Sequence, residues 1–302
     1  MLSYRKLAMR VLGRPLHTGG GNDSPRPASQ RAAAFILTAA MLTTLTAPAF
    51  ADIWHIENGD ITVKAGDTEG TNKVTQGTTI DKVDTNTTIT NSNKDKASSN
   101  TVTIEAKDKD DKVEVTLDNV NIKADSGSAI TSKGDVTLTL KGDNSLTGGI
   151  SDNGSYGLRG ISSNGSLTIT GGETDSLTAQ GGSGTYDGGS GIYSNSLTIS
   201  GGTVNATGGK SGADGSGGAG IHSGSFTIYG GTVNAKGGNG GNVSGAGIIS
   251  DGSVTISGGT VKATGGDSKD GYGGDGIRSG GVVTISGNTV NAAGGNGGKV
   301  GG

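Results

Sequence analysis

One position of a repeated segment carries side chains whose chemistry suits ligand contact. The segment beginning at Gly220, GIHSGSFTIYGGTVNAKGG, recurs in altered copies on both sides. The residue after the leading isoleucine differs between copies: Ser162, Tyr193, His222, Ile249 and Arg278. A tyrosine ring can stack on a sugar, and histidine or arginine can bind hydroxyl groups or a carboxylate. Tyr193, His222 and Arg278 are therefore candidate binding residues, although an exposed position that tolerates any residue would vary in the same way.

A second set of positions repeats polar residues instead of varying. One position holds threonine in four copies, and the position two residues later holds asparagine or lysine. The residues are Thr203, Thr232, Thr260 and Thr289, followed by Asn205, Asn234, Lys262 and Asn291. A further threonine series comprises Thr168, Thr198, Thr227, Thr255 and Thr284. Such a grid of hydroxyls and amides could lie along an extended glycan, or order water as an ice-binding surface does. Threonine also favours strands and asparagine ladders stabilise stacked chains, so a purely structural role explains the grid as well.

Aspartates in the glycine-rich stretches between copies are candidate calcium ligands. They are Asp187, Asp214, Asp267, Asp270 and Asp275. Carboxylates beside flexible backbone carbonyls supply the hard oxygen ligands that calcium prefers. These stretches resemble the calcium-binding GGxGxD nonapeptide, but that motif repeats every nine residues and these recur about every 29. Calcium is accordingly the one cofactor that the sequence suggests.

Catalysis has little support in the sequence. A lyase needs a base beside calcium-binding acids, and a glycoside hydrolase needs paired carboxylates. Beyond residue 51 the only arginines are Arg159 and Arg278, and no outward series repeats Asp or Glu. His55 and His222 stand without a nearby nucleophile motif. We therefore expect a protein that is not an enzyme.

The candidate residues must be positioned by the repeat itself. The leading isoleucines, Ile161, Ile192, Ile221, Ile248 and Ile277, are 31, 29, 27 and 29 residues apart. Apolar residues alternate with polar ones inside each copy, which predicts strands, with Ile221, Phe226, Ile228, Val233 and Ala235 inward. Three short strands per copy and glycines at the corners predict an all-β, right-handed parallel β-helix with coils of roughly 29 residues, and length changes confined to the glycine-rich loops.

Residues 1–51 differ from everything that follows. An apolar run follows Arg31, and Ala49-Phe50-Ala51 has the small-x-small pattern that a signal peptidase cuts, so we expect a secreted or cell-surface protein. A misassigned start codon and a membrane anchor are the alternatives. Without the six basic residues and one acid of this leader, 18 Lys and Arg face 26 Asp and Glu. That acidic balance argues against nucleic acid and anionic membranes as partners. Because the chain has no cysteine, its stability must come from the stacked strands.

The chain after the leader divides into two regions. Residues 52–100 are less regular, and we expect them to form an N-terminal cap, with Trp54 more easily explained by capping than by sugar stacking. Residues 101–302 hold the β-helix repeats. The chain stops at Gly302 inside a stretch that elsewhere leads to another coil, so we expect either a truncated sequence or end-to-end self-association.

The repeats resemble a known family. The run from Thr101 to Ile130, then VTLTLKGDNSLTGG from Val136 and the copies with GI, LTISGG and TVNATGG, is similar to secreted bacterial carbohydrate-binding proteins with a fold like that of pectate lyases. The resemblance spans roughly 86–302. It implies calcium-assisted binding of an extracellular polysaccharide without catalysis, with acidic polysaccharides among the candidate ligands. The alternative hypothesis is a structural or adhesive cell-surface protein that binds a host or neighbouring-cell partner.

Overall fold

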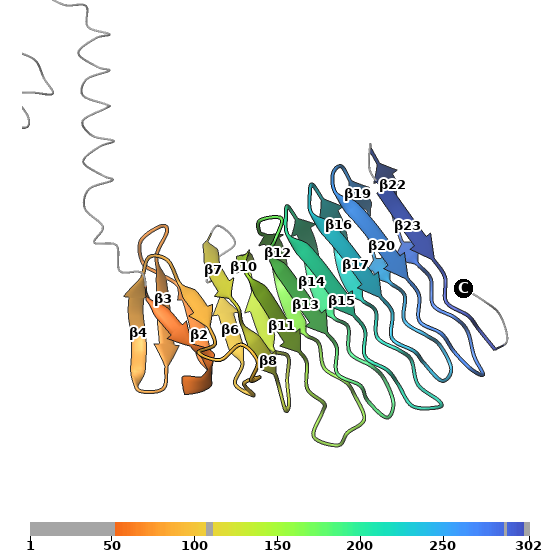
Figure 1. Ribbon diagram of the computed structural model, residues 1–302, viewed down its shortest axis with the longest axis horizontal. Coiled ribbons are helices and arrows are strands. Elements are labelled where there is room, and N and C mark those ends of the chain that lie inside the picture. The colour runs from red at the N-terminus through yellow and green to blue at the C-terminus, as the bar shows by residue number, and fades with distance from the viewer. Residues whose placement is uncertain (1–51, 107–110, 287–288, 299–302) are drawn as a thin grey trace, which may run out of the picture. The chain divides into compact units, whose positions relative to one another are not determined.

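The protein is a parallel β-helix whose strands lie on three faces. The computed structural model describes residues 52–106, 111–286 and 289–298, all within one compact unit. The proposed leader, 1–51, lies outside the described residues. Figure 1 shows successive coils stacked side by side along this unit. No helix in the described part of the chain is long and apolar enough to cross a membrane.

The first two faces belong to one 16-stranded sheet. Face one contains β2 (Ile61–Ala65), β6 (Val102–Glu105), β9 (Ile130–Lys133), β18 (Ile248–Ser250) and β21 (Ile277–Ser279). Face two contains β1 (Ile53–His55), β5 (Thr88–Thr90), β7 (Lys112–Asp118), β10 (Asp135–Lys141), β19 (Val254–Ile256) and β22 (Val283–Ile285). Three long strands run across the corner between these faces: β12 (Ile161–Thr170), β14 (Ile192–Ile199) and β16 (Ile221–Ile228). These long strands join the two faces into a single sheet.

Face three is a separate sheet of seven parallel strands. It contains β8 (Asn121–Lys123), β11 (Asp143–Thr147), β13 (Ser176–Gln180), β15 (Thr203–Thr207), β17 (Thr232–Lys236), β20 (Thr260–Thr264) and β23 (Thr289–Ala293). Equivalent residues of successive coils pair one to one, as Val204 does with Val233. The three strands per repeat that the sequence predicts are thus confirmed, in about seven coils.

The interior is a continuous apolar stack. Ile221, Phe226, Ile228 and Val233 are fully buried, and Ala235 is 2% exposed, as their alternation predicts. The same inward positions in neighbouring coils join them in one cluster. Because each coil contributes only a few apolar side chains, the core depends on contact between coils rather than within one.

Coil length changes at two places, not one. The glycine-rich loops differ in length, as predicted, but so does the corner between faces one and two. Two residues separate Ser223 from Phe226, whereas three separate Ser250 from Val254. Where the corner is longer, the strand divides into β18 and β19; in β12 the extra residue is absorbed by a bulge between Ser163 and Ser166.

The N-terminal end is closed by an antiparallel hairpin. β3 (Asn72–Gln76) pairs antiparallel with β2, and β4 (Thr79–Asp84) pairs with β3. Parallel pairing already begins at β1 and β2, on either side of the 3-10 turn Ile56–Asn58, so coils start before residue 101. Trp54 is 7% exposed and donates its indole N–H to the buried Asp84 carboxylate at 2.8 Å. The tryptophan therefore packs in the cap and offers no free ring to a sugar.

Four inward-facing serines are stacked at the end of face one. Ser132, Ser163, Ser194 and Ser223 stack in register, and each buried hydroxyl has no hydrogen-bond partner. In the divided strand, by contrast, the Ser250 hydroxyl donates to the Ser253 carbonyl at 3.1 Å. A buried hydroxyl without a partner is destabilising by about 1–3 kcal/mol.

Ser194→Ala is therefore expected to leave the free energy of unfolding unchanged or to raise it by about 1 kcal/mol. The matched variant Ser250→Ala removes a bonded hydroxyl and is expected to lower it by about 1 kcal/mol. Urea denaturation followed by circular dichroism measures both. A larger loss for Ser194→Ala than for Ser250→Ala would contradict the unpartnered state of the Ser194 hydroxyl.

Candidate functional site

The varied outward residues form a straight column on face one. Pairing places Ser162 beside Tyr193, Tyr193 beside His222, His222 beside Ile249, and Ile249 beside Arg278. Each has a half-buried or exposed side chain, so the column faces outward as predicted. We call these five residues the column. Its members lie about 4.8 Å from one coil to the next, the spacing of paired strands.

Four side chains join around Tyr193 into a connected cluster. The Arg159 guanidinium carbon lies 4.2 Å from the centre of the Tyr193 ring. On the next coil the His222 ring meets Tyr193 edge-on, with centroids 5.3 Å apart and an interplanar angle of 84°. The His222 Nε2 lies 3.2 and 3.3 Å from the two carboxylate oxygens of Asp251. The Tyr193 cluster thus combines a held aromatic ring with a cation, an imidazole and a carboxylate.

Two members of this cluster are absent from the sequence-based candidates. Arg159 precedes Gly160, at a position that holds Ser190, Ala219, Ala246 and Asp275 in the following coils. A long cation at a position where these copies have none was the available signal. Asp251 lies in the corner that gained a residue, and its contact with His222 is diagonal across coils, so period alone could not reveal it.

The glycine-rich loops form a second line beside the column. Backbone bridges and hydrogen bonds align Tyr156, Asp187, Ser216, Val243 and Tyr272 coil by coil. We call these residues the ridge. Tyr156 is 48% and Tyr272 49% exposed, and the Tyr156 ring lies 6.1 Å from that of Tyr186. Exposed aromatic rings therefore stand at both ends of the ridge.

A hollow separates the ridge from the column. It measures about 240 Å³ and is bounded by Ser216 and Val243 on the ridge and by Ile249 and Arg278 on the column. Its floor includes glycines of three coils, Gly217, Gly245 and Gly274. The ridge, the floor and the column run parallel because each is repeated once per coil. We call this surface, from Tyr156 and Arg159 to Arg278, the strip.

The predicted calcium ligands serve partly as caps between loops. An Asp187 carboxylate oxygen accepts the Ser216 backbone N–H at 2.9 Å, and Asp267 accepts that of Asn296 at 2.7 Å. Asp214 and Asp270 are exposed, while Asp275 borders the hollow. Among the described residues, no three Asp, Glu or His side chains come together in a group that could hold a metal ion. The five aspartates do not converge, and calcium binding stays a prediction.

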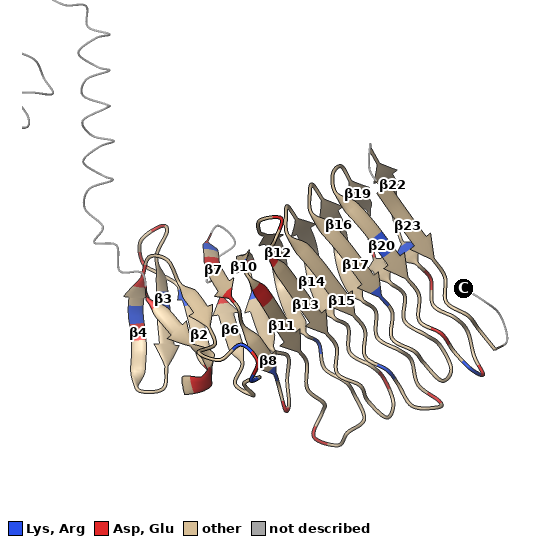
Figure 2. Cartoon of the chain, in the orientation of Figure 1, with Lys and Arg blue, Asp and Glu red and all other residues tan. Residues whose placement is uncertain are grey.

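The threonine and asparagine grid lies on face three in the predicted register. Thr203, Thr232, Thr260 and Thr289 form one series, beside Asn205, Asn234, Lys262 and Asn291. The Asn234 amide donates to the Asn205 side-chain oxygen at 2.9 Å. This bond joins two coils, so these amides have a structural use. Figure 2 shows that charged residues are concentrated in the N-terminal strands and in the loops. The strands of the later coils carry few of them.

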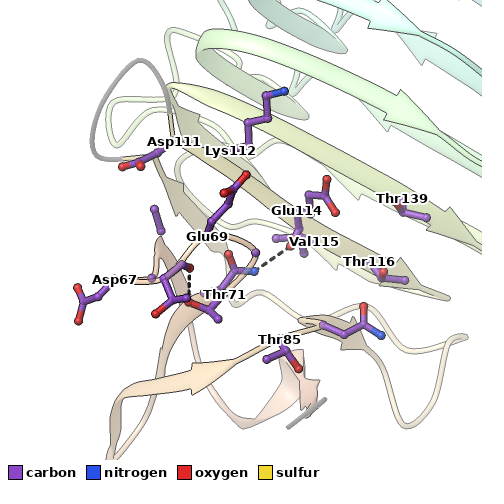
Figure 3. Close-up of a pocket in the computed structure, with 16 residues that line it drawn as sticks. Asp67, Glu69, Thr71, Thr85, Asp111, Lys112, Glu114, Val115, Thr116 and Thr139 are labelled. Atoms are coloured by element: carbon purple, nitrogen blue, oxygen red, sulfur yellow. Dashed lines mark hydrogen bonds between the residues drawn. The ribbon is translucent and has the colours of Figure 1, made fainter. Parts of the chain in front are cut away.

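A larger pocket lies at the N-terminal end. It measures about 810 Å³, between the loop joining β2 to β3 and the outward side chains of β7 and β10. Figure 3 shows Asp67 and Glu69 on that loop and Lys112 and Glu114 across from it. Asp67 pairs with Lys73 at 2.7 Å, and the hydrogen bond that the Lys73 ammonium donates to Asp67 raises the pKa of Lys73. The pocket is polar and predominantly acidic, and no sequence motif marks it.

Neither described histidine has the geometry of a nucleophile–base–carboxylate array. The Ser92 hydroxyl and the Glu57 carboxylate both approach Nδ1 of His55, at 3.0 and 3.8 Å. Burial would raise the pKa of Glu57, but hydrogen bonds from Ser92 hold it below its usual value. Because both groups share one ring nitrogen, Glu57 cannot orient His55 toward Ser92 from the opposite nitrogen. The His222 imidazole is hydrogen-bonded to Asp251, and no serine or threonine hydroxyl of the described residues bonds to it.

The comparisons with known proteins bear on the fold. A family model described as a beta helix repeat matches residues 197–225, 226–248 and 254–277. No curated protein and no solved structure shows significant similarity to the chain. The matched segments lie in consecutive coils and include His222 of the column, and with the three-faced stack they support a parallel β-helix protein.

Proposed function

We propose that this chain binds an extracellular polysaccharide, without catalysis, along the strip. The observation that carries the proposal is the Tyr193 cluster, where Arg159 and His222 hold a half-exposed tyrosine ring. Sugar recognition needs an apolar ring face with hydrogen-bond donors beside it, and the cluster supplies both. The resemblance of the repeats to carbohydrate-binding β-helix proteins points the same way.

The repeat makes a polymer a better ligand than a single sugar. Column residues recur every coil, about 4.8 Å apart, so a chain running along the strip would meet successive side chains. Arg159 and Arg278 lie at its two ends, four coils apart, and both can form bidentate bonds with a carboxylate. An acidic polysaccharide is therefore the preferred ligand class, with calcium as an assisting ion.

Affinity electrophoresis of the purified chain on plant and microbial glycans, with calcium and with a chelator, tests the proposal. Tyr193→Ala is expected to weaken retention roughly tenfold, because losing a stacked ring costs about 1.4 kcal/mol. Tyr229→Ala removes an exposed ring on face two, outside the strip, and is the matched control that is expected to bind normally. The proposal fails if no glycan retains the unchanged chain, or if both variants bind equally well. If the chelator leaves retention unchanged, only the proposed role of calcium is contradicted, and polysaccharide binding stands.

Adhesion to a protein on another cell is the second candidate function. Its supporting observation is the ridge, where Tyr156, Val243 and Tyr272 are exposed and the exposed Tyr186 ring lies beside that of Tyr156. Tyrosine is enriched at protein interfaces because it combines apolar area with a hydroxyl. Binding of the chain to whole cells that survives enzymatic removal of their glycans would favour adhesion over polysaccharide binding.

A further inference from the structure

Face two presents a regular array of hydroxyl groups that the strip does not use. Six threonines pair in unbroken register: Thr137, Thr168, Thr198, Thr227, Thr255 and Thr284. A serine series, Ser166, Ser196 and Ser225, runs beside them on one side. Thr139, Thr170, Ser200 and Ser257 follow on the other. We call these residues the hydroxyl face. Its hydroxyls are spaced about 4.8 Å between strands and about 6.6 Å along a strand.

The central hydroxyls are not used to hold the fold together. The side chains of Thr168, Thr198 and Thr227 are half-buried, and their hydroxyls form no hydrogen bond within the described protein. In the flanking serine series, by contrast, the Ser225 hydroxyl donates to that of Ser196 at 3.0 Å, and on face three the Asn234 amide donates to Asn205. The central threonines of the hydroxyl face therefore leave their hydroxyls to the solvent.

Strand preference alone does not account for this composition. Strands accept valine, isoleucine and aromatic residues as readily as threonine. The outward column on face one varies freely between coils, whereas the central position of face two keeps threonine six times. From Ser166 to Ile256 no outward strand position of face two carries a charge. A neutral, flat, repeated hydroxyl array points to a neutral and repetitive partner.

We propose that the hydroxyl face binds ice. Each hydroxyl can donate and accept, so neighbouring threonines can share ordered waters at a fixed spacing. The methyl groups between them leave water few other bonding choices, which favours a lattice over disordered hydration. An ice surface is uncharged and periodic in two directions, as this face is. The series of Thr139, Thr170, Ser200 and Ser257 is interrupted once: the coil between Ser200 and Ser257 has Tyr229 at this position, 63% exposed.

Thermal hysteresis and inhibition of ice recrystallisation, measured on the purified chain, test this inference. The unchanged chain is expected to show both. The double variant Thr198→Lys with Thr227→Lys is expected to lose them, because charged side chains disrupt the array. The matched double variant Thr203→Lys with Thr232→Lys, on face three, is expected to retain them. Circular dichroism checks that each variant keeps its strands.

A gain of activity provides the independent test. Tyr229→Thr continues the outer series with a hydroxyl in place of the ring, so its hysteresis should exceed that of the unchanged chain even if the lysine variants fail to fold. Absence of hysteresis in the unchanged chain overturns the inference. The inference is also overturned if the face-two double variant keeps its hysteresis and loses only binding to a crystalline polysaccharide. That result would make a glycan surface the ligand of the hydroxyl face. Retention of soluble glycans on the strip is independent of all these outcomes.

Discussion

Phe226→Ala is expected to lower the free energy of unfolding by about 3–5 kcal/mol, the usual cost of emptying the volume of a buried phenylalanine. Phe226 is fully buried and stacks in register between Leu197 and Val254 of the adjacent coils. Its loss would leave a cavity that these two branched side chains cannot fill without moving their own strands. Because every coil relies on its neighbours for burial, the cost falls on three coils at once.

Urea denaturation followed by circular dichroism measures this loss. Thr227→Ala is the matched control, since it removes an outward side chain from the same strand and should change stability by less than about 0.5 kcal/mol. If stacked coils unfold in parts, the Phe226→Ala curve should also broaden or show a second transition. Equal stability of the two variants would show that the apolar stack does not hold these coils together.

The fold could be predicted because the repeat constrains it many times over. Ile221, Phe226 and Ile228 recur with one alternation in each coil, and a register that buried one set would bury the others. The hairpin of β3 and β4 occurs once, in a stretch without the repeat. A single strand pair carries no such redundancy, so its antiparallel pairing could be found only from the turn around Gly77.

The site was partly predictable for the same reason. The column follows from the period, because parallel pairing places Tyr193 directly beside His222. Contacts that leave the column do not. Arg159 reaches Tyr193 from a different position of the repeat, and Asp251 reaches His222 from the corner. Such contacts depend on side-chain length and corner geometry, which periodicity does not encode.

The loop aspartates show the limit of reading chemistry from residue type. A carboxylate in a glycine-rich loop suits both a calcium ion and an unpaired backbone N–H. In this stack the next coil supplies the N–H groups, and Asp187 and Asp267 accept them. The sequence contains no feature that separates the two uses, because both require an acid in a flexible loop.

The glycines beneath the strip make the remaining large prediction. A Cβ on Gly218 would lie 2.0 Å from the Gly189 carbonyl oxygen, and one on Gly245 would lie 1.9 Å from that of Gly218. Real Cβ atoms do not approach backbone so closely, so loops of successive coils would have to separate. Gly218 has no left-handed φ, and close approach alone requires glycine there. Gly218→Ala should therefore lower the free energy of unfolding by about 3 kcal/mol or more.

Gly172→Ala is the matched control, because its Cβ would meet no backbone atom and would lie 3.0 Å from the Asp175 carboxylate, which accepts the Gly172 and Gly142 N–H groups. Its effect is expected to stay within about 1 kcal/mol, because a small shift of that carboxylate offsets the gain from reduced unfolded-chain freedom. Urea denaturation measures stability, and affinity electrophoresis measures the strip. Since Gly218 adjoins the floor between the ridge and the column, its replacement should weaken glycan retention even in the fraction that remains folded. A stable Gly218→Ala chain with full retention would mean that the loops need not pack closely for the strip to bind.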